Sequence, residues 1–300
     1  MRVLVTGATG NVGRHVTAGV VEAGIEARAL TRNPARAQLP GAEVVQGDLT
    51  APESVPFDGV DRMFLFPEPS TAKEIVERAV RAGVQRIVVL SSGAVTGGFD
   101  TTFHPPVERA VEESGVRSGV EWTHIRPGEF AANKLALWGP SIRAERVVRD
   151  ANPDSAWFPV HERDVADAAL AALLENGRGH HGKAYDVNGP EMITSREQVR
   201  AIADALGEEV GFEEVTAAEA REIYRRIGGL AAEAADFLLG FTDYDGNPAD
   251  PADAGNAGNA GTAGDFDPST LGPLPTVRSV TGGSPRTFAQ WARDRVEDFR

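Results

Sequence analysis

A glycine-rich loop near the start of the chain is the feature that most limits its fold. The segment "TGATGNVG" follows the β-rich run "RVLVTG" at residues 2–7 and leads into a helical stretch. Its glycines Gly7, Gly10 and Gly13 permit positive φ and a close approach of the backbone to a bound anion. The N–H groups of Asn11 and Val12, at the start of the helix, then point toward that anion. A strand, a glycine loop and a helix in this order predict a dinucleotide-binding domain, whereas a tight turn without a ligand is the alternative.

Short β-rich runs alternate with helical stretches over the first 127 residues. The runs lie at 2–7, 26–31, 43–48, 62–67, 86–92 and 121–127, and several lack the in/out alternation of a half-exposed strand. Such runs are typical of parallel strands covered on both faces. Helices are expected over 71–83 and 105–115, ending at Gly83 and Gly115. The pattern predicts an α/β protein with a doubly wound parallel Rossmann sheet.

After Pro127 the rhythm changes, and a smaller, mostly helical C-terminal substrate or cap domain is expected. We place the Rossmann domain at 1–130, with strands returning near 155–190, and the cap region at 131–300. Helices are expected around 195–206, 217–227 and 230–241, and a last helix begins with Pro285 at its first position. The segment 245–265 has almost no large apolar residue, so a flexible loop is expected there.

Charge and cysteine content exclude several classes of function. A formal net charge of −14 opposes general binding to nucleic acid. No apolar run approaches the roughly 20 residues of a membrane span, and no export signal is visible at the start. The chain has no cysteine, which rules out disulfides and thiolate metal sites. No metal site is expected, because His161, His180 and His181 lack ligand spacing. We expect a cytoplasmic protein that acts on a small molecule, and a homodimer is compatible with the sequence.

The end of the second strand indicates which cofactor the glycine loop holds. An NAD site usually has an Asp or Glu about 20 residues beyond the loop, which accepts hydrogen bonds from the ribose hydroxyls. Here the segment "TRNPAR" has no carboxylate, and Arg32 can bind a 2′-phosphate, so NADP(H) is expected. The alternative for Arg32 is a solvated loop charge. Asp48 ends the third strand, where it either reaches the adenine amino group or caps a turn.

These motifs resemble the NmrA-like group of atypical short-chain dehydrogenase/reductases. The resemblance is carried by "TGATGNVG", "TRNPAR", "GDL", "SSGAV", "WTHIRPGEFAAN", "HERDVADAA" and "YDVNGPEMITSREQ", which cover most of residues 1–210. It implies a Rossmann sheet, an NADP-preferring site and a small C-terminal domain over the nicotinamide end. The residues expected to contact the cofactor are Gly7, Thr9, Gly10, Asn11, Val12, Gly13, Arg32, Asp48, Leu49, Phe66, Ser91, Pro127 and Gly128.

The resemblance also shows that the usual catalytic pair is missing. Short-chain reductases usually carry Ser after the fifth strand and Tyr-x-x-x-Lys about a dozen residues later. Here Ser91 and Ser92 follow "RIVVL", but His104 stands where the Tyr is expected and Glu108 where the Lys is expected. His104 is therefore a candidate proton donor, with Ser92 beside the substrate. Alternatively, His104 caps a helix begun by Pro105 and Pro106, and Glu108 complements the dipole of its first turn.

Aromatic residues after the sixth strand are candidates for a substrate pocket: Phe130, Trp138 and Trp157. Large aromatic side chains are more often part of a core. Three functions stay open at this point. The first is an NADPH-dependent reductase of a small conjugated or quinone-like substrate, whose reduction spreads charge and needs no dedicated Tyr. The others are a non-catalytic NADP(H) sensor and a biosynthetic isomerase or cyclase on the same fold.

Overall fold

The computed structural model describes residues 1–249, 274 and 276–300, and these form two compact units. Unit 1 consists of the described residues of Met1–Gly128, Glu162–Val187 and Pro275–Ser284. Unit 2 consists of those of Glu129–His161, Asn188–Leu274 and Pro285–Arg300. The chain therefore leaves unit 1 after the sixth strand of its sheet and later returns to supply one more strand.

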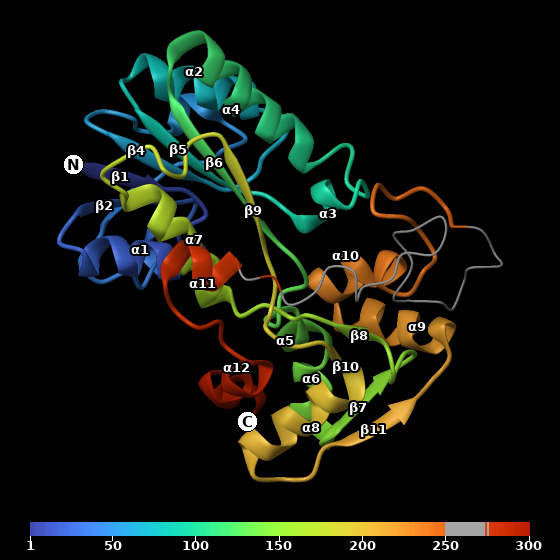
Figure 1. Ribbon diagram of the computed structural model, residues 1–300. Helices are drawn as coiled ribbons and strands as arrows, with labels where there is room; N and C mark the ends of the chain where they lie inside the picture. Colours follow the sequence, from blue (N-terminus) through green and yellow to red (C-terminus); the bar gives the residue numbers. More distant parts are fainter. Residues whose placement is uncertain (250–273, 275) are drawn as a thin grey trace. The chain divides into compact units, whose positions relative to one another are not determined.

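Unit 1 contains a seven-stranded sheet in the order β3-β2-β1-β4-β5-β6-β9. Every neighbouring pair of strands in it is parallel, which confirms the predicted doubly wound fold (Figure 1). Strand β5 is buried along its whole length, as its apolar sequence predicts. The strands are β1 (Arg2–Val5), β2 (Glu26–Thr31), β3 (Glu43–Gln46), β4 (Arg62–Leu65), β5 (Arg86–Leu90), β6 (Glu121–Pro127) and β9 (Lys183–Val187).

Helices cover both faces of this sheet (Figure 1). On one face lie α1 (Gly13–Glu22), α7 (Glu162–Leu174) and the short α11 (Thr276–Thr281). On the other lie α2 (Ala72–Arg81) and α4 (His104–Ser118), where Ile75, Val76, Val107 and Val111 join one apolar core with the sheet. The short helix α3 (Gly93–Thr96) follows β5 and contacts β6 and β9. Ala79 of α2 and Ala110 of α4 are buried beside them.

The expected end of α4 at Gly115 is wrong. The helix continues to Ser118 and ends at Gly119, whose φ is +77°. Gly115 lies inside the helix, where a Cβ would be 2.8 Å from Cδ1 of Trp122. The glycine is therefore required by close packing of α4 against β6 and not by a turn, a tertiary cause that periodicity alone does not reveal.

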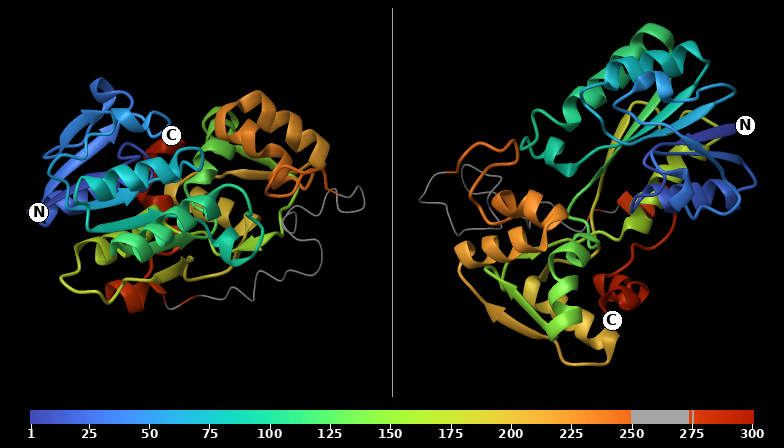
Figure 2. Two further views of the ribbon diagram at one scale, coloured as in Figure 1. Left: turned by 90° about the horizontal axis from the view of Figure 1, so that it is seen from above. Right: turned by 180° about the vertical axis from the view of Figure 1, so that it is seen from behind.

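Unit 2 is mostly helical, with two pairs of short strands. The helices are α5 (Asn133–Leu137), α6 (Gly139–Glu145), α8 (Ser195–Leu206), α9 (Ala217–Ile227), α10 (Gly229–Leu238) and α12 (Phe288–Asp294). The parallel pair is β7 (Val147–Asp150) with β11 (Gly211–Glu214), and the antiparallel pair is β8 (Ala156–Trp157) with β10 (Ile193–Thr194). Figure 2 shows α9 and α10 side by side, and their apolar faces join a core built around Trp138, Tyr224 and Trp291.

The last helix begins later than the sequence predicts. Residues 284–287 precede it, and α12 starts at Phe288. The hydroxyl of Thr287 accepts a hydrogen bond from the N–H of Gln290 at 3.1 Å, which makes Thr287 the N-cap in place of a start at Pro285. The expected inward side chains Phe288, Trp291 and Ala292 are buried.

Two further expectations concern flexibility and membranes. The predicted loop 245–265 lies, from residue 250 onward, outside the described residues. Among the helices that the structure describes, none combines the length and apolar composition that a membrane span requires.

We expect Gly115→Ala to destabilise the protein by about 1–3 kcal/mol, because the added methyl group overlaps Trp122. Helix propensity alone predicts the opposite, a gain of about 1 kcal/mol. The matched control is Val116→Ala on the next residue of the same helix, which is 90% exposed and should change stability little. Urea unfolding of the three proteins decides between the two effects, and a more stable Gly115→Ala variant would show that the contact is not tight.

Candidate functional site

The glycine loop has the backbone geometry that a closely approaching phosphate requires. Gly7 has φ +58°, and its carbonyl oxygen accepts a hydrogen bond from the N–H of Gly10 at 2.9 Å. A Cβ on Gly13 would be 2.2 Å from the oxygen of Gly7, so no larger residue fits there without moving the loop. The spacing seen in the sequence is therefore set by the tight turn itself.

The start of α1 leaves backbone donors free for an anion. The N–H groups of Asn11, Val12 and Gly13 donate to no acceptor among the residues that the structure describes. Unsatisfied donors at a helix N-terminus, together with the helix dipole, favour a phosphate. Phe66 stands directly beside Gly7 and is 45% exposed. The loop therefore fits the pyrophosphate of a dinucleotide.

Arg32 and Asp48 lie at the carboxyl ends of β2 and β3. Arg32 is exposed directly after β2, and its charge contributes to a lowered pKa of Asp48. The larger causes of that lowered pKa are hydrogen bonds from the N–H and hydroxyl of Thr50, at 3.0 and 2.9 Å. These are the bonds of the turn-capping alternative for Asp48. Leu49 packs against the apolar core, and the contacts of these residues with a cofactor stay a prediction.

Glu108 is held in a buried ion pair, which the sequence did not reveal. Its carboxylate accepts two hydrogen bonds from Arg126 at the end of β6, at 2.8 and 2.6 Å. The hydroxyl of Ser91, just after β5, donates to the same carboxylate at 2.6 Å. Glu108 and Ser91 are 4% and 3% exposed, so the carboxylate is shielded from water, whereas the side chain of Arg126 is 19% exposed. Glu108 therefore joins α4 to the ends of β5 and β6 and does more than complement a helix dipole.

The environment of this pair keeps both partners charged. Burial by itself raises the pKa of Glu108, but hydrogen bonds from Arg126 and Ser91 and the charges of His124 and Arg126 bring it below its usual value. The hydrogen bonds to Glu108 are the main cause that raises the pKa of Arg126. Glu108 is then an anion at neutral pH with no proton to give, in contrast to the Lys that it replaces.

The same guanidinium also fixes the segment that follows β5. Arg126 donates to the hydroxyl of Thr96 at 3.0 Å, and Thr96 donates to Asp186 on β9 at 2.7 Å. Ser92 caps α3, since its hydroxyl oxygen accepts from the N–H of Ala94 at 3.2 Å. The ends of β5, β6 and β9 are thus connected by side chains, and a catalytic role for Ser92 stays a prediction.

His104 is the first residue of α4, and a buried carboxylate holds it there. Its Nδ1 lies 2.5 Å from Oδ2 of Asp100, whose side chain is 0% exposed. The expected cap is therefore supplied by Asp100, which accepts from the N–H of His104 at 3.0 Å. Sequence reasoning missed Asp100. The available signal was the four-residue spacing between Asp100 and His104, within a turn rich in glycine and threonine.

A second histidine near Glu108 could form a metal-ligand cluster. Ligand atoms of Glu108, Glu112 and His124 all lie within 4.8 Å of one another. Both carboxylate oxygens of Glu108 are already bound by Arg126, however, and Nε2 of His124 lies 3.1 Å from a carboxylate oxygen of Glu112. Within the described residues this cluster is best explained as part of the ion-pair network.

The remaining predicted site residues lie at the end of β6 and in unit 2. Pro127 ends β6, and the N–H of Gly128 donates to Val187 on β9 at 3.1 Å. The three predicted pocket residues all lie in unit 2. Trp138 is 1% exposed in its core and donates to Asp150 at 3.0 Å, which favours a structural role. Phe130 pairs with Val160 and Trp157 lies on β8, and their contact with a substrate stays a prediction.

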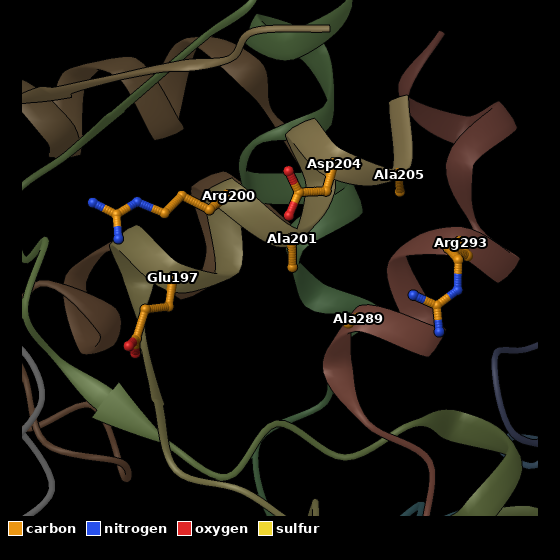
Figure 3. Close-up of a pocket in the computed structure, with 7 residues that line it drawn as sticks. All are labelled: Glu197, Arg200, Ala201, Asp204, Ala205, Ala289 and Arg293. Carbon is orange, nitrogen blue, oxygen red and sulfur yellow. The ribbon is translucent and has the colours of Figure 1, made fainter. Parts of the chain in front are cut away.

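Unit 2 also has a cleft of about 260 Å³ between α8 and α12 (Figure 3). None of the predicted site residues lines it. Alanines and four charged side chains form its wall, and these residues are Glu197, Arg200, Ala201, Asp204, Ala205, Ala289 and Arg293.

Comparison with known proteins agrees with this geometry. Residues 7–176 match the family described as NAD(P)H-binding. The chain is 36% identical to the (4-alkanoyl-5-oxo-2,5-dihydrofuran-3-yl)methyl phosphate reductase of Streptomyces griseus, with 99% of each chain covered. It is 28% identical to the NAD(P)H azoreductase of Xenophilus azovorans, again with 99% of each covered.

The fold is also that of a solved structure. The triphenylmethane reductase of Citrobacter sp., crystallised with NADP(H), superposes with a TM-score of 0.72 at 18% identity, with 99% of this chain and 100% of that chain covered. The glycine loop, the parallel sheet and the full-length relative together show that the chain belongs to the NAD(P)H-binding family, among the NmrA-like atypical short-chain dehydrogenase/reductases.

Proposed function

We propose that this protein is an NADPH-dependent reductase of a small conjugated carbonyl compound, with His104 as the proton donor. The observation that carries the proposal is the charged Glu108–Arg126 pair in the position of the usual lysine. This pair cannot support a tyrosine, and the sequence contains no Tyr between residues 1 and 184. The substrate must therefore be one whose reduction does not need the usual Tyr-Lys pair.

A conjugated acceptor meets this requirement. A cofactor bound over the glycine loop supplies a hydride. When the hydride adds to a carbon–carbon double bond conjugated with carbonyl groups, the negative charge spreads over the conjugated system. The resulting enolate is a far weaker base than an isolated alkoxide, so a histidine or water can protonate it. Reduction of an isolated ketone lacks this advantage.

The Streptomyces griseus relative supports the same substrate class. Its name describes a dihydrofuranone whose ring carries an alkanoyl group and a phosphorylated methyl group. In such a compound the ring double bond is conjugated with the lactone carbonyl and with the ketone. We propose acyl butenolides of this kind as the first substrates to test, with quinones as the second class.

The direct test is NADPH consumption with a panel of acceptors. We expect turnover with an acyl butenolide, with or without phosphate, or with a benzoquinone, and no measurable turnover with a saturated ketone such as cyclohexanone. Product analysis should show a saturated carbon–carbon bond or a hydroquinone. Tight NADPH binding without turnover of any acceptor would contradict the reductase and favour a sensor.

Arg32→Ala tests the preference for NADPH. If Arg32 binds the 2′-phosphate, its contacts to a charged group contribute about 1.5–3 kcal/mol. The variant should then bind NADPH at least about tenfold more weakly and NADH almost unchanged, which calorimetric titration can measure. The control is Arg36→Ala in the same exposed loop, which should affect both cofactors little. An equal loss for both cofactors in Arg32→Ala would refute the assignment.

Glu108→Gln tests whether the buried pair is ionised. Removal of one partner leaves the half-buried Arg126 without its anion, so we expect a loss of up to about 3 kcal/mol in unfolding free energy at pH 7. Because the pKa of Glu108 is lowered in the folded protein, the ion pair stabilises the fold above the usual pKa of a glutamate. This stabilisation disappears as the pH falls through the folded value, so the difference from wild type should shrink below about pH 4.3.

The matched control is Glu113→Gln on the same helix, whose pair with Arg117 is exposed and should contribute about 0–1 kcal/mol. Urea unfolding at several pH values measures both variants. An equal effect of the two substitutions would contradict a buried, charged pair.

A further inference from the structure

Asp100 has a buried carboxylate and is not among the residues expected to contact the cofactor. We infer that Asp100 is a positioning residue, which holds the proton of neutral His104 on Nδ1 and leaves Nε2 as the atom that protonates the substrate. This inference rests on the proposed function, in which His104 is the proton donor.

The carboxylate of Asp100 is enclosed and held by many donors. Oδ1 accepts from the N–H groups of Thr102 and Phe103, at 3.2 and 2.9 Å. Oδ2 accepts from the N–H of His104 at 3.0 Å and faces its ring at 2.5 Å. The side chain is 0% exposed and lies at the N-terminal end of a 15-residue helix. Backbone donors and the helix dipole both favour an anion, so Asp100 acts as an acceptor.

An acceptor at this position decides the tautomer of the histidine. A carboxylate has no proton to offer, so Nδ1 of His104 must carry the hydrogen of their contact. In the neutral ring Nε2 is then an acceptor, and in the charged ring it is the second donor. Nε2 of His104 therefore takes up a proton from water when the ring is neutral and gives it to the substrate when the ring is charged.

The orientation of the ring agrees with this role. The ring of Phe103 packs edge-on against that of His104, with centroids 5.0 Å apart. The side chain of His104 is 12% exposed and Phe103 is 44% exposed. The imidazole ring is therefore held in place but is still partly accessible to solvent. An exposed aromatic ring beside the donor also offers an apolar contact for a flat, conjugated substrate.

Backbone contacts place this dyad at the same end of the sheet as Ser91. His104 and Glu108 are one helical turn apart and share a face of α4, so their Cβ atoms are about 5–6 Å apart. Glu108 contacts Ser91 at the end of β5. The N–H of Asp100 donates to Ala94 on α3 at 3.2 Å. Ligands of open α/β sheets bind outside the carboxyl ends of their strands, where this dyad lies.

The proposed reaction transfers one hydride and one proton to the acceptor. Hydride from NADPH adds to the β-carbon of the conjugated acceptor, which breaks the carbon–carbon π bond and leaves an enolate and NADP⁺. The Nε2–H bond of the charged His104 then breaks, and its proton forms a C–H or O–H bond with that enolate. Neutral His104 recovers a proton from water at the same nitrogen, while the hydrogen on Nδ1 stays with Asp100.

A purely structural role as a helix cap is the alternative for Asp100. Asp100→Asn removes the negative charge but keeps an oxygen that can cap α4. A comparison with His104→Gln and with the double variant separates the two roles. If Asp100 acts through His104, its substitution has no further effect on catalysis once the histidine is gone.

The experiment measures steady-state NADPH oxidation, with the acceptor that wild type reduces best, for all four proteins. We expect Asp100→Asn to lower kcat by on the order of 10²-fold without changing the KM for NADPH, and to cause no further loss in the His104→Gln background. Equal, additive losses in both backgrounds, or a loss of stability with unchanged kcat, would overturn the inference.

Nitrogen-15 NMR of the wild-type protein gives a readout that does not depend on activity. The chain has six histidines, and the spectrum of His104→Gln identifies the signals of His104. A neutral ring with its proton on Nδ1 supports the inference, and a proton on Nε2 with a bare Nδ1 overturns it. Absence of turnover in wild type would refute the reductase alone, because the tautomer would still show whether Asp100 fixes the ring.

Discussion

The site in unit 1 depends on one buried ion pair, between Glu108 on α4 and Arg126 on β6. Neither charge is stable in a medium of low dielectric without the other, so the helix and the strand must meet with these two residues in contact. That contact also sets the position of His104, which lies one turn earlier on the helix. A helix shifted by a single residue would turn His104 by about 100° and leave Arg126 without its carboxylate.

Three carboxylates of unit 1 show how environment assigns different roles to the same chemical group. Asp48 is partly exposed and caps a turn through Thr50. Glu108 is buried opposite a guanidinium and carries a fixed charge. Asp100 is buried among backbone N–H groups and faces an imidazole. The last arrangement pairs a carboxylate with an imidazole, the side chain most often used in general acid–base chemistry, so it alone among the three is suited to proton transfer.

The sequence predicted the architecture well because the relevant signals are local. Apolar runs without alternation gave the parallel strands, and the glycine spacing gave the loop before α1. Two of the errors have tertiary causes. Gly115 looked like a helix end because its contact with Trp122 joins positions that pair only after β6 has packed. Glu108 looked like a first-turn acid because its partner lies 18 residues away on a strand. The contact between Asp100 and His104 was not predicted, because it depends on the exact path of the intervening turn.

The discontinuity of both units in the chain has a consequence for how such proteins diversify. Strand β9 comes from a segment that follows Gly128 by more than thirty residues, and unit 2 is encoded by the pieces between and after the segments of unit 1. A single crossover between two related genes would therefore always divide at least one of the two units between the parents. Recombination at one point cannot exchange a whole unit, so new specificities in this architecture are expected to arise by substitution and by changes of loop length.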